Sequence, residues 1–273
     1  MTRRTISVSV TRMNAPWKPE QLERNRFVRF RTAYTFDRFI DLPRDGRLKI
    51  LDFGCGDGHS IDALLDRFPN AHFTGVDVSP TPQFADHPRV TTIRMSGPLA
   101  TDSIGSGFDV IQLNAVFEHL LPSERKQLMP DLWNRLAPGG YFVVTETPWR
   151  WFPIETHTTS LPFVNYMPDR LAFAAFRYCG RFPHAVTWEA ALREGLRGGT
   201  VAEIVSCLDA PERSVNFATT NEADARDMLE VWWRGECRHT RQKALAYNML
   251  RWFHRLSGIV VSPWVNFVLR KSA

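Results

Sequence analysis

Short apolar runs alternate with helical segments between residues 48 and 146, and this alternation constrains the fold more than any other feature. The apolar runs are LKILDF (48–53), HFTGVDV (72–78), VTTIRM (90–95), FDVIQLN (108–114) and GGYFVVTE (139–146). The segments 60–68 and 123–136 have helical spacing, with Ser123 as the expected N-cap of the second and Pro130 predicting a kink or break in it. Nearly continuous apolar strands alternating with helices predict a parallel sheet covered on both faces.

The flanking segments predict four regions. Residues 1–41 form an N-terminal arm and an amphipathic helix over 20–41, and residues 42–147 form the core. Residues 148–200 are rich in aromatics and proline and are expected to form a lid or acceptor region. Residues 201–273 are expected to complete the core with strands at 201–208 and 263–271. Between these strands, residues 210–258 are expected to form a cap insertion, with helical spacing at 222–256.

Composition limits the classes of partner. The 273 residues are 44% hydrophobic and 23% charged, which is typical of a globular protein with a sizeable core. The formal charge of +5 is mild, and the basic residues are scattered apart from 24–31, so we expect no nucleic-acid partner. No secretory signal or long apolar run is visible, which predicts a cytoplasmic protein without a membrane span. The cysteines lie far apart without zinc spacing and are expected to be reduced packing residues: Cys55, Cys179, Cys207 and Cys237.

A glycine-rich loop, LDFGCGDGHS (51–60), follows the first expected strand and opens a helix. Gly54, Gly56 and Gly58 allow a tight turn and the close approach of a ligand to the backbone. The next strand ends at Asp77, about 20 residues after Gly56, where a carboxylate can bind both hydroxyls of a ribose. Position 59 is histidine rather than the glycine of the dinucleotide fingerprint, so a compact amino-acid tail suits this loop better than a pyrophosphate.

These residues resemble motif I and the following acidic motif of the class I S-adenosylmethionine-dependent methyltransferases. FDVIQLNAVFEHL (108–120) is similar to the fourth-strand motif of that family, and its EHL ending is common in one large branch. LAPGGYFVVTETP (136–148) is similar to the family's hairpin and fifth strand. The resemblance covers about residues 48–148. It implies an α/β, Rossmann-like fold with a doubly wound, seven-stranded, mostly parallel sheet, an antiparallel last strand and a helical cap.

The resemblance also implies the residues that bind S-adenosyl-L-methionine. Asp52, Gly54, Cys55 and Gly56 would border the methionine moiety, although Cys55 could equally fill space beside the glycines. Asp77 would bind the ribose, Val78 would lie against the adenine and Asn114 under the sulfonium. Many members carry an acid after the third strand to bind the adenine amine. Here that stretch is RMSGPL (94–99), so Ser96 or a backbone carbonyl would substitute.

Candidate bases bear on the chemistry of the acceptor, because an alcohol is a poor nucleophile until its proton is being removed. Position selects His119, Glu146, Glu155 and His157. Glu146 could instead orient a loop, and His119 could pack at the sheet edge. Glu155 and His157 alternate along an extended loop, so they could face the acceptor together and share a proton or hold a divalent ion such as magnesium. They could also be solvated residues that tie down the lid.

The loop TPWRWFPIETHTTSLPFVNYMP is similar to one in a bacterial methyltransferase branch that modifies polysaccharides and glycolipids. Its aromatic residues Trp149, Trp151, Phe152 and Phe163 could stack on sugar rings or fill the lid's own core. We therefore expect an O-methyltransferase acting on a hydroxyl of a saccharide or glycolipid precursor. The alternatives are an aromatic or polyketide-type natural product as acceptor, RNA as acceptor, or a non-catalytic scaffold. The basic and aromatic stretch 248–256 could make peripheral membrane contact or pack on the cap.

Overall fold

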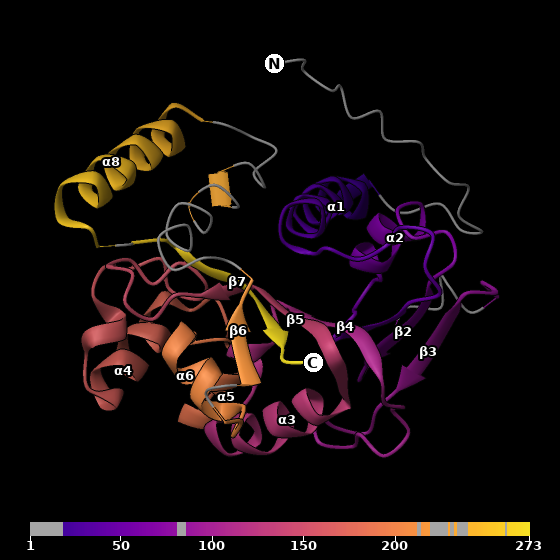
Figure 1. Cartoon of the computed structure of the whole chain (residues 1–273). Helices are drawn as coiled ribbons and strands as arrows, with labels where there is room; N and C mark the ends of the chain where they lie inside the picture. The colour runs from indigo at the N-terminus through magenta and orange to yellow at the C-terminus, as the bar shows by residue number, and fades with distance from the viewer. Residues whose placement is uncertain are drawn as a thin grey trace.

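The computed structural model describes residues 19–80, 86–211, 214–218, 229, 232–233, 240–259 and 261–273. Its centre is one seven-stranded sheet with the order β3-β2-β1-β4-β5-β7-β6 (Figure 1). The strands are β1 (Lys49–Phe53), β2 (His72–Asp77), β3 (Val90–Arg94), β4 (Phe108–Asn114), β5 (Leu136–Pro148), β6 (Val215–Phe217) and β7 (Trp264–Lys271). Neighbours among β1 to β5 pair in parallel, whereas β7 runs antiparallel to both β5 and β6. The expected doubly wound, mostly parallel sheet with an antiparallel last strand is confirmed.

Helices cover both faces of the sheet (Figure 1). On one face lie α1 (Pro19–Phe39) and α2 (His59–Leu65), whose Phe36 and Leu64 join a buried cluster with side chains of β1, β2 and β4. On the other face lie α3 (Pro122–Arg135) and α6 (Val201–Cys207), whose Leu132 and Ile204 join a second cluster. Successive residues along each central strand point alternately into the two clusters, so both faces of the strand must be apolar.

The prediction of a strand at 201–208 is wrong, because this segment forms the helix α6. Its apolar positions recur at helical spacing, so Ile204 and Leu208 are buried together against the sheet. The hydroxyl of Thr200 accepts a hydrogen bond from the backbone N–H of Glu203 and caps the helix. The remaining strand is instead β6, which lies within the segment expected to be a helical insertion.

Helix α3 begins one residue earlier than expected. Pro122 occupies the first turn, where its missing N–H costs nothing, and the Glu124 carboxylate accepts a hydrogen bond from the backbone N–H of Leu121 at 2.9 Å. Ser123 is therefore inside the helix rather than its N-cap. Pro130 does not break the helix, which continues to Arg135.

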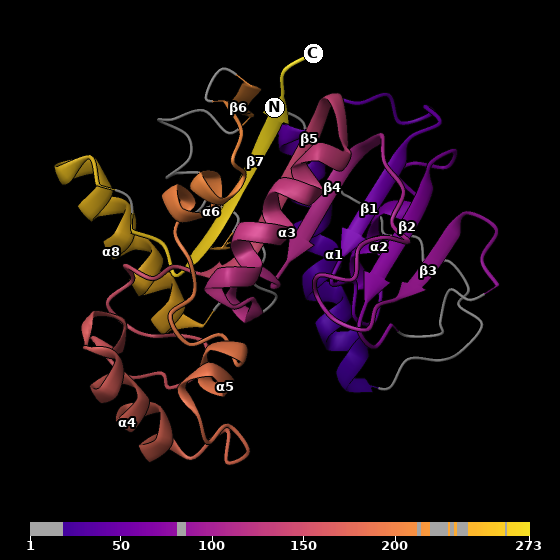
Figure 2. The same ribbon diagram turned by 90° about the horizontal axis from the view of Figure 1, so that it is seen from below.

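The lid contains a short turn η3 (Val164–Tyr166) and the helices α4 (Asp169–Cys179) and α5 (Trp188–Arg193). It has its own apolar core, which includes Val164, Phe176 and Leu196. Figure 2 shows α4 and α5 beyond the end of the sheet toward which the parallel strands point. Ligands bind at this end in open α/β sheets, so the lid lies on the functional side of the molecule.

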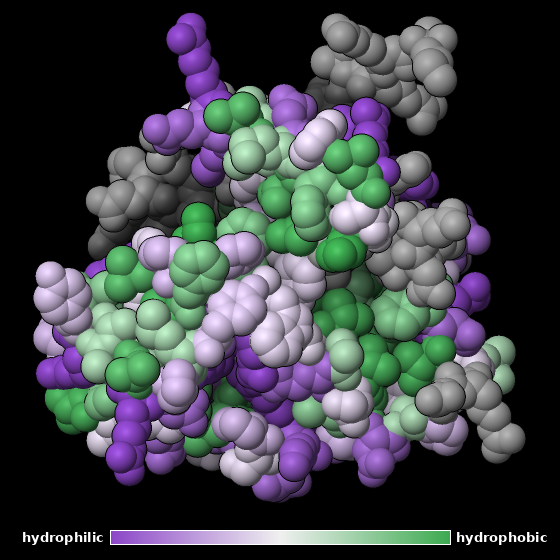
Figure 3. Space-filling view, turned by 90° about the vertical axis from the view of Figure 1, so that its left-hand side faces the viewer, coloured by the Kyte–Doolittle hydropathy of each residue, from purple (hydrophilic) through white to green (hydrophobic). Residues whose placement is uncertain are grey.

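Helix α8 (Arg241–Ser257) exposes a stripe of large apolar side chains, including Leu245, Met249, Trp252 and Leu256. Figure 3 looks onto this side of the molecule, with hydrophobic residues gathered in the upper part where α8 lies. Much of the helix expected at 222–256 lies outside the described residues, and so does Cys237. No described helix is both long and apolar enough to cross a bilayer. Peripheral membrane contact by α8 stays a prediction.

Candidate active site

The glycine loop turns tightly against the end of β2. Gly54 and Gly56 have φ angles of 74° and 47°, in the left-handed region that favours glycine. The N–H groups of Gly54 and Cys55 both donate to the carbonyl of Val76, at 2.7 and 3.1 Å. A Cβ at Gly54 would lie 2.4 Å from Val116 Cγ2, so only glycine allows this approach. The loop is therefore held beside the end of β4, where Val116 lies.

Asp77 is fixed by the backbone on both sides. Its Oδ2 accepts a hydrogen bond from the N–H of Gly56 at 2.9 Å, and its Oδ1 accepts one from the N–H of Ser79 at 2.8 Å. Each oxygen keeps a further lone pair for a ligand. The carboxylate thus joins the glycine loop to the end of β2, where a ribose would have to lie for the expected contact.

Asp52 and Cys55 form the buried floor below this loop. Burial raises the pKa of Asp52 to about 7, the Gln112 amide partly offsets this, and repulsion by Asp77 adds to it. Burial also raises the pKa of the Cys55 thiol, followed by repulsion from Asp52 and Asp77. A neutral thiol packed beside Gly75 fits the packing role better than a reactive one.

Asn114 ends β4 and is expected to lie between the methyl donor and the acceptor. Its amide Nδ2 donates to the Ser60 hydroxyl at 3.1 Å, whereas its Oδ1 is buried and has no hydrogen-bond partner among the described residues. A buried acceptor without a partner is costly unless a ligand supplies the donor. Val78 and Ser96 are exposed at the ends of β2 and β3, on the side of the sheet edge where the adenine is expected.

Glu146 lies at an irregularity in β5, with a φ of 65° and a shift of the β5–β7 register. Its backbone N–H donates to Asn266 Oδ1 at 2.9 Å, and its carboxylate forms an ion pair with Arg31 of α1. A carboxylate neutralised by a guanidinium is a weak base, so this geometry favours a role in holding α1 over the strand ends. The alternative of a loop-orienting residue is the better interpretation of Glu146.

Three other side chains converge beyond the end of β4: Glu118 and His119 of the turn η2 (Phe117–His119), and His157 of the lid. Each offers one ligand or proton-accepting atom, and the three atoms lie within 4.8 Å of one another. The rings of His119 and His157 are 5.3 Å apart, and the ring of Trp264 is 6.3 Å from that of His157. The structure therefore brings the two candidate histidines together and adds Glu118, which was not among the expected site residues.

Burial makes this cluster unusual. It raises the pKa of Glu118 to about 7, against smaller opposing effects of His119 and of hydrogen bonds that include one from Thr147. It also lowers the pKa of His157 to about 4, helped by His119 and opposed by Glu155. His157 is thus a neutral imidazole at physiological pH, which makes it a weak base but leaves it a lone pair for a metal ion or a hydrogen-bond donor.

A buried arginine holds the turn that presents the cluster. Arg125 of α3 donates to the carbonyls of Leu120 and Glu118 and lies over the Phe117 ring. Its guanidinium also pairs with Glu203 of α6 at 2.6 Å. These contacts connect the turn to two helices, so Glu118 and His119 sit on a rigid support.

Gly195 closes one side of the cluster. Its φ is 93°, and a Cβ there would lie 2.5 Å from Cδ2 of His157 and 3.3 Å from Cγ of Glu118. The glycine allows the lid backbone to press against both side chains. The glycine-rich stretch 194–199 indicates in the sequence that the backbone turns tightly there, but only the fold shows that Gly195 faces His157 and Glu118.

Glu155 has a structural task within the lid loop. Its two oxygens accept hydrogen bonds from the backbone N–H groups of His157, Thr158 and Thr159 and from both threonine hydroxyls. Burial alone would raise its pKa, but these hydrogen bonds together hold the pKa below its usual value. An ionised and fully engaged carboxylate is a poor base and has little left for a metal, so we do not keep Glu155 in either role.

The lid aromatics divide between the two expected roles. Trp149 packs against the main core. Trp151 and Phe163 are 52% and 60% exposed, and Tyr166 beside them is 49% exposed. The Tyr166 ring lies 6.0 Å from Trp151 and 6.3 Å from Phe163, so the three form an exposed aromatic group on the lid.

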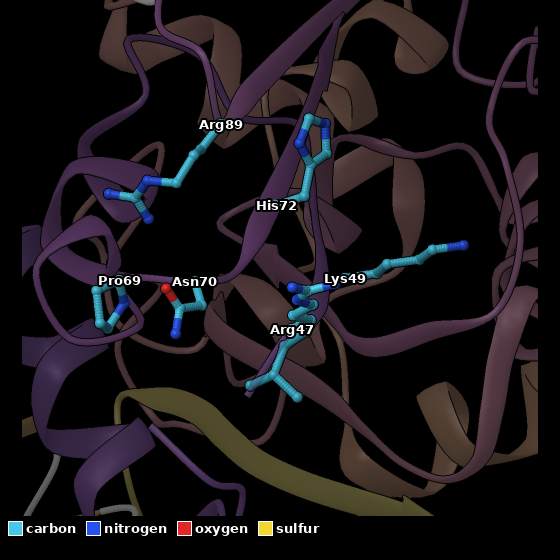
Figure 4. A pocket seen from close by; sticks show the side chains of 7 residues that line it. Arg47, Lys49, Pro69, Asn70, His72 and Arg89 are labelled. Atoms are coloured by element: carbon cyan, nitrogen blue, oxygen red, sulfur yellow. The ribbon is translucent and has the colours of Figure 1, made fainter. Parts of the chain in front are cut away.

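A surface pocket lies at the opposite, amino-terminal edge of the sheet (Figure 4). Its lining includes Arg47, Lys49, His72 and Arg89. Arg89 donates to the carbonyls of Phe68 and Leu65 and so caps the end of α2. Because this edge is far from the glycine loop in the topology, we assign the pocket no part in methyl transfer.

Comparisons with known proteins find methyltransferases. The profile of a methyltransferase domain matches residues 51–142. A trans-aconitate 2-methyltransferase of Rhodopseudomonas palustris (strain BisA53) is 29% identical over 237 residues, covering 75% of this chain and 88% of the relative. One of Variovorax paradoxus (strain S110) is also 29% identical, over 78% of this chain and 94% of the relative.

A solved structure is similar in fold. PKMT2 from Rickettsia typhi, in complex with AdoHcy, gives a TM-score of 0.50 at 14% identity, covering 89% of this chain and 53% of that one. The glycine cradle, the backbone-held Asp77 and the buried Asn114 oxygen fit the S-adenosylmethionine expected there. The chain is an S-adenosylmethionine-dependent methyltransferase with a class I, Rossmann-like fold.

Proposed function

We propose that the protein methylates a hydroxyl of a small polar acceptor, of the saccharide or glycolipid-precursor class. The observation that carries this proposal is the cluster of Glu118, His119 and His157. Glu118 and His119 follow Asn114 within five residues along the chain, and His157 of the lid packs against them. An acceptor that is already a good nucleophile needs no such group of proton-accepting side chains. A hydroxyl needs it, because its proton must leave as the new bond forms.

The chemistry is an in-line displacement. A lone pair of the acceptor oxygen forms the bond to the methyl carbon, the carbon–sulfur bond breaks, and its electron pair stays on sulfur to give S-adenosylhomocysteine. The hydroxyl proton leaves to the cluster, where a carboxylate and two imidazoles lie together and offer lone pairs to accept it. The rest of the catalysis is alignment of the two reactants.

The lid supports a saccharide acceptor. The exposed rings of Trp151, Phe163 and Tyr166 lie on the segment that also carries His157. Flat aromatic surfaces suit the apolar faces of sugar rings, and the hydrogen bond from the Tyr166 hydroxyl to the Trp151 carbonyl, at 2.5 Å, holds this group together. A phenolic acceptor would also stack on such rings, so it is included in the test below.

A second candidate function is methylation of a carboxylate. The names of the two relatives, trans-aconitate 2-methyltransferase, favour it. An ionised carboxylate needs no base and instead needs cationic groups to bind it. Two arginines of α1, Arg29 and Arg31, are engaged in ion pairs with Asp62 and Glu146, and Arg181 of the lid donates to the carbonyl of Thr158. We therefore prefer the hydroxyl.

Transfer of labelled methyl from S-adenosylmethionine to a panel of acceptors tests the proposal. The panel contains mono- and oligosaccharides, phenols, trans-aconitate and RNA, and mass spectrometry locates the methyl group in the product. We expect transfer to a saccharide hydroxyl that is lost in His157→Ala and kept in His184→Ala, whose side chain pairs with Glu194 in the lid. Transfer to trans-aconitate alone, unaffected by His157→Ala, would replace the hydroxyl with a carboxylate.

A further inference from the structure

We propose that Glu118, His119 and His157 bind one divalent transition-metal ion, of the zinc, cobalt or manganese type. These residues contribute one carboxylate oxygen and two imidazole nitrogens, all within 4.8 Å of one another. Among the described residues this is the one group of three such side chains with that spacing. It differs from the Glu155 and His157 pair expected from the sequence, because Glu155 is engaged within its own loop.

Outer contacts turn two of the ligand atoms toward each other. His119 Nδ1 lies 2.7 Å from the carbonyl of Arg193, which can only accept, so Nδ1 carries the hydrogen and Nε2 keeps its lone pair. The Thr147 hydroxyl donates to Glu118 Oε2 at 3.2 Å. Nε2 of His119 and Oε1 of Glu118 remain, and they face each other at 3.9 Å. Metal ligands are commonly held by second contacts of this kind.

Glu118 provides an independent observation. Its side chain is completely buried, and its Oε1 has no hydrogen-bond partner among the residues that the structure describes, the neighbouring histidines included. A separation of 3.9 Å from His119 Nε2 is too long for a hydrogen bond. An ion with bonds of about 2.0–2.2 Å to both atoms would set them about 3.0–3.4 Å apart. This pair of atoms therefore needs to approach by less than about 1 Å to bind one ion.

The donor set selects the kind of ion. Two imidazoles and a carboxylate suit zinc, cobalt, manganese or iron, whereas magnesium and calcium prefer ligand sets made of oxygen. Three protein ligands leave at least one position open, which is typical of catalytic rather than structural sites. Among the described residues the group holds no fourth imidazole, thiol or carboxylate, so no such side chain fills the open position.

The role of the ion, but not its binding, rests on the proposed function. An acceptor hydroxyl in the open position would be held for the displacement, and its pKa would fall because the cation stabilises the alkoxide. The same position would orient a neighbouring hydroxyl of a saccharide. A carboxylate acceptor could also bind there, so the metal site and the class of acceptor are tested separately.

Direct binding measurements test the site. The protein is stripped with EDTA and titrated with Co²⁺, whose visible absorption reports nitrogen and oxygen coordination, and equilibrium dialysis with Zn²⁺ gives stoichiometry and affinity. The variants are Glu118→Gln, His119→Ala and His157→Ala. Matched controls are His184→Ala, which breaks an exposed His–Glu pair in the lid, and His72→Ala at the opposite sheet edge.

We expect one ion per chain. Each ligand variant should weaken metal affinity at least about 100-fold, because even the loss of a residue that only hydrogen-bonds a ligand costs up to about 100-fold. The two controls should keep the affinity of the parent, and all variants should keep binding to S-adenosylhomocysteine, which shows that they are folded. No stoichiometric Co²⁺ or Zn²⁺ binding, or equal binding in all three ligand variants, would overturn the site. Saccharide methylation that is insensitive to EDTA in a protein that binds no ion would also overturn it while leaving the proposed function standing. An ion bound by these residues in a protein that methylates no hydroxyl would support the site and refute the proposed function.

Discussion

Replacement of Asp77 by alanine tests the donor half of the site. The carboxylate is held by the N–H groups of Gly56 and Ser79, at 2.9 and 2.8 Å, so its position does not depend on a ligand. It is therefore ready to accept hydrogen bonds from two ribose hydroxyls. Asp77→Ala removes both of these bonds and frees the two backbone donors to bind water.

The size of the effect follows from these contacts. A hydrogen bond to a charged group contributes about 1.5–3 kcal/mol. Asp77 is partly exposed, so water replaces part of what is lost, and we expect a net loss of about 1.5–3 kcal/mol for the two bonds together. Because about 1.4 kcal/mol corresponds to tenfold in affinity, the dissociation constant should rise about 10- to 100-fold.

Calorimetric titration with S-adenosylhomocysteine measures this change. Asp109→Ala is the matched control, since Asp109 accepts a hydrogen bond from the N–H of Lys49 at 2.8 Å but lies at the amino-terminal end of β4. It should bind the ligand as the parent does. A dissociation constant for Asp77→Ala within about twofold of the parent, in a protein whose melting temperature matches that of the control, would refute the ribose assignment.

Three further predictions concern other parts of the site. His157→Ala should lower kcat at least about 100-fold and leave S-adenosylhomocysteine affinity unchanged, because the side chain serves the acceptor half; full activity would move the base to His119. Burial raises the pKa of Asp52 in the folded protein from 3.8 to about 7, so the free energy of unfolding falls as pH rises from about 4, where the unfolded carboxyl ionises, to about 7. In urea unfolding without donor, Asp52→Asn should be more stable than the parent near pH 8 and lose this advantage near pH 4; a constant difference would contradict the burial argument. Gly195→Ala should displace the His157 ring and lower both turnover and melting temperature, whereas Gly107→Ala, which has a φ of 71° and open space around it, should cost only about 1–2 kcal/mol of backbone strain; equal turnover in the two variants would argue against the close contact.

The core of the fold was predictable because its signals are local. Each apolar run from 48 to 146 became a strand within a few residues of its expected bounds, and Gly54, Gly56 and Asp77 follow strands as their pattern indicated. The strand predicted at 201–208 is wrong, because a short apolar run of this length fits a strand and a buried helix equally well. Burial of Ile204 and Leu208 on one side, together with the Thr200 cap, made the segment helical.

The acceptor half was less predictable because it depends on contacts between distant segments. Position alone placed His119 and His157 near the site, but nothing in the sequence showed that Glu118 would be buried between them. Nor could it show that Gly195, far along the chain, would press on both. Glu155 illustrates the reverse case. Its place in the loop suggested chemistry, whereas the threonines that follow it, Thr158 and Thr159, hold its carboxylate within the turn.

A crystal structure with S-adenosylhomocysteine is the most direct test of the account, because it measures where the donor sulfur lies relative to the acceptor cluster. We predict the ribose on Asp77 and the sulfur beside Asn114, with its open side toward Glu118, His119 and His157. A sulfur that faces away from this cluster, or one separated from it by the main core, would contradict the assignment of the cluster to methyl transfer.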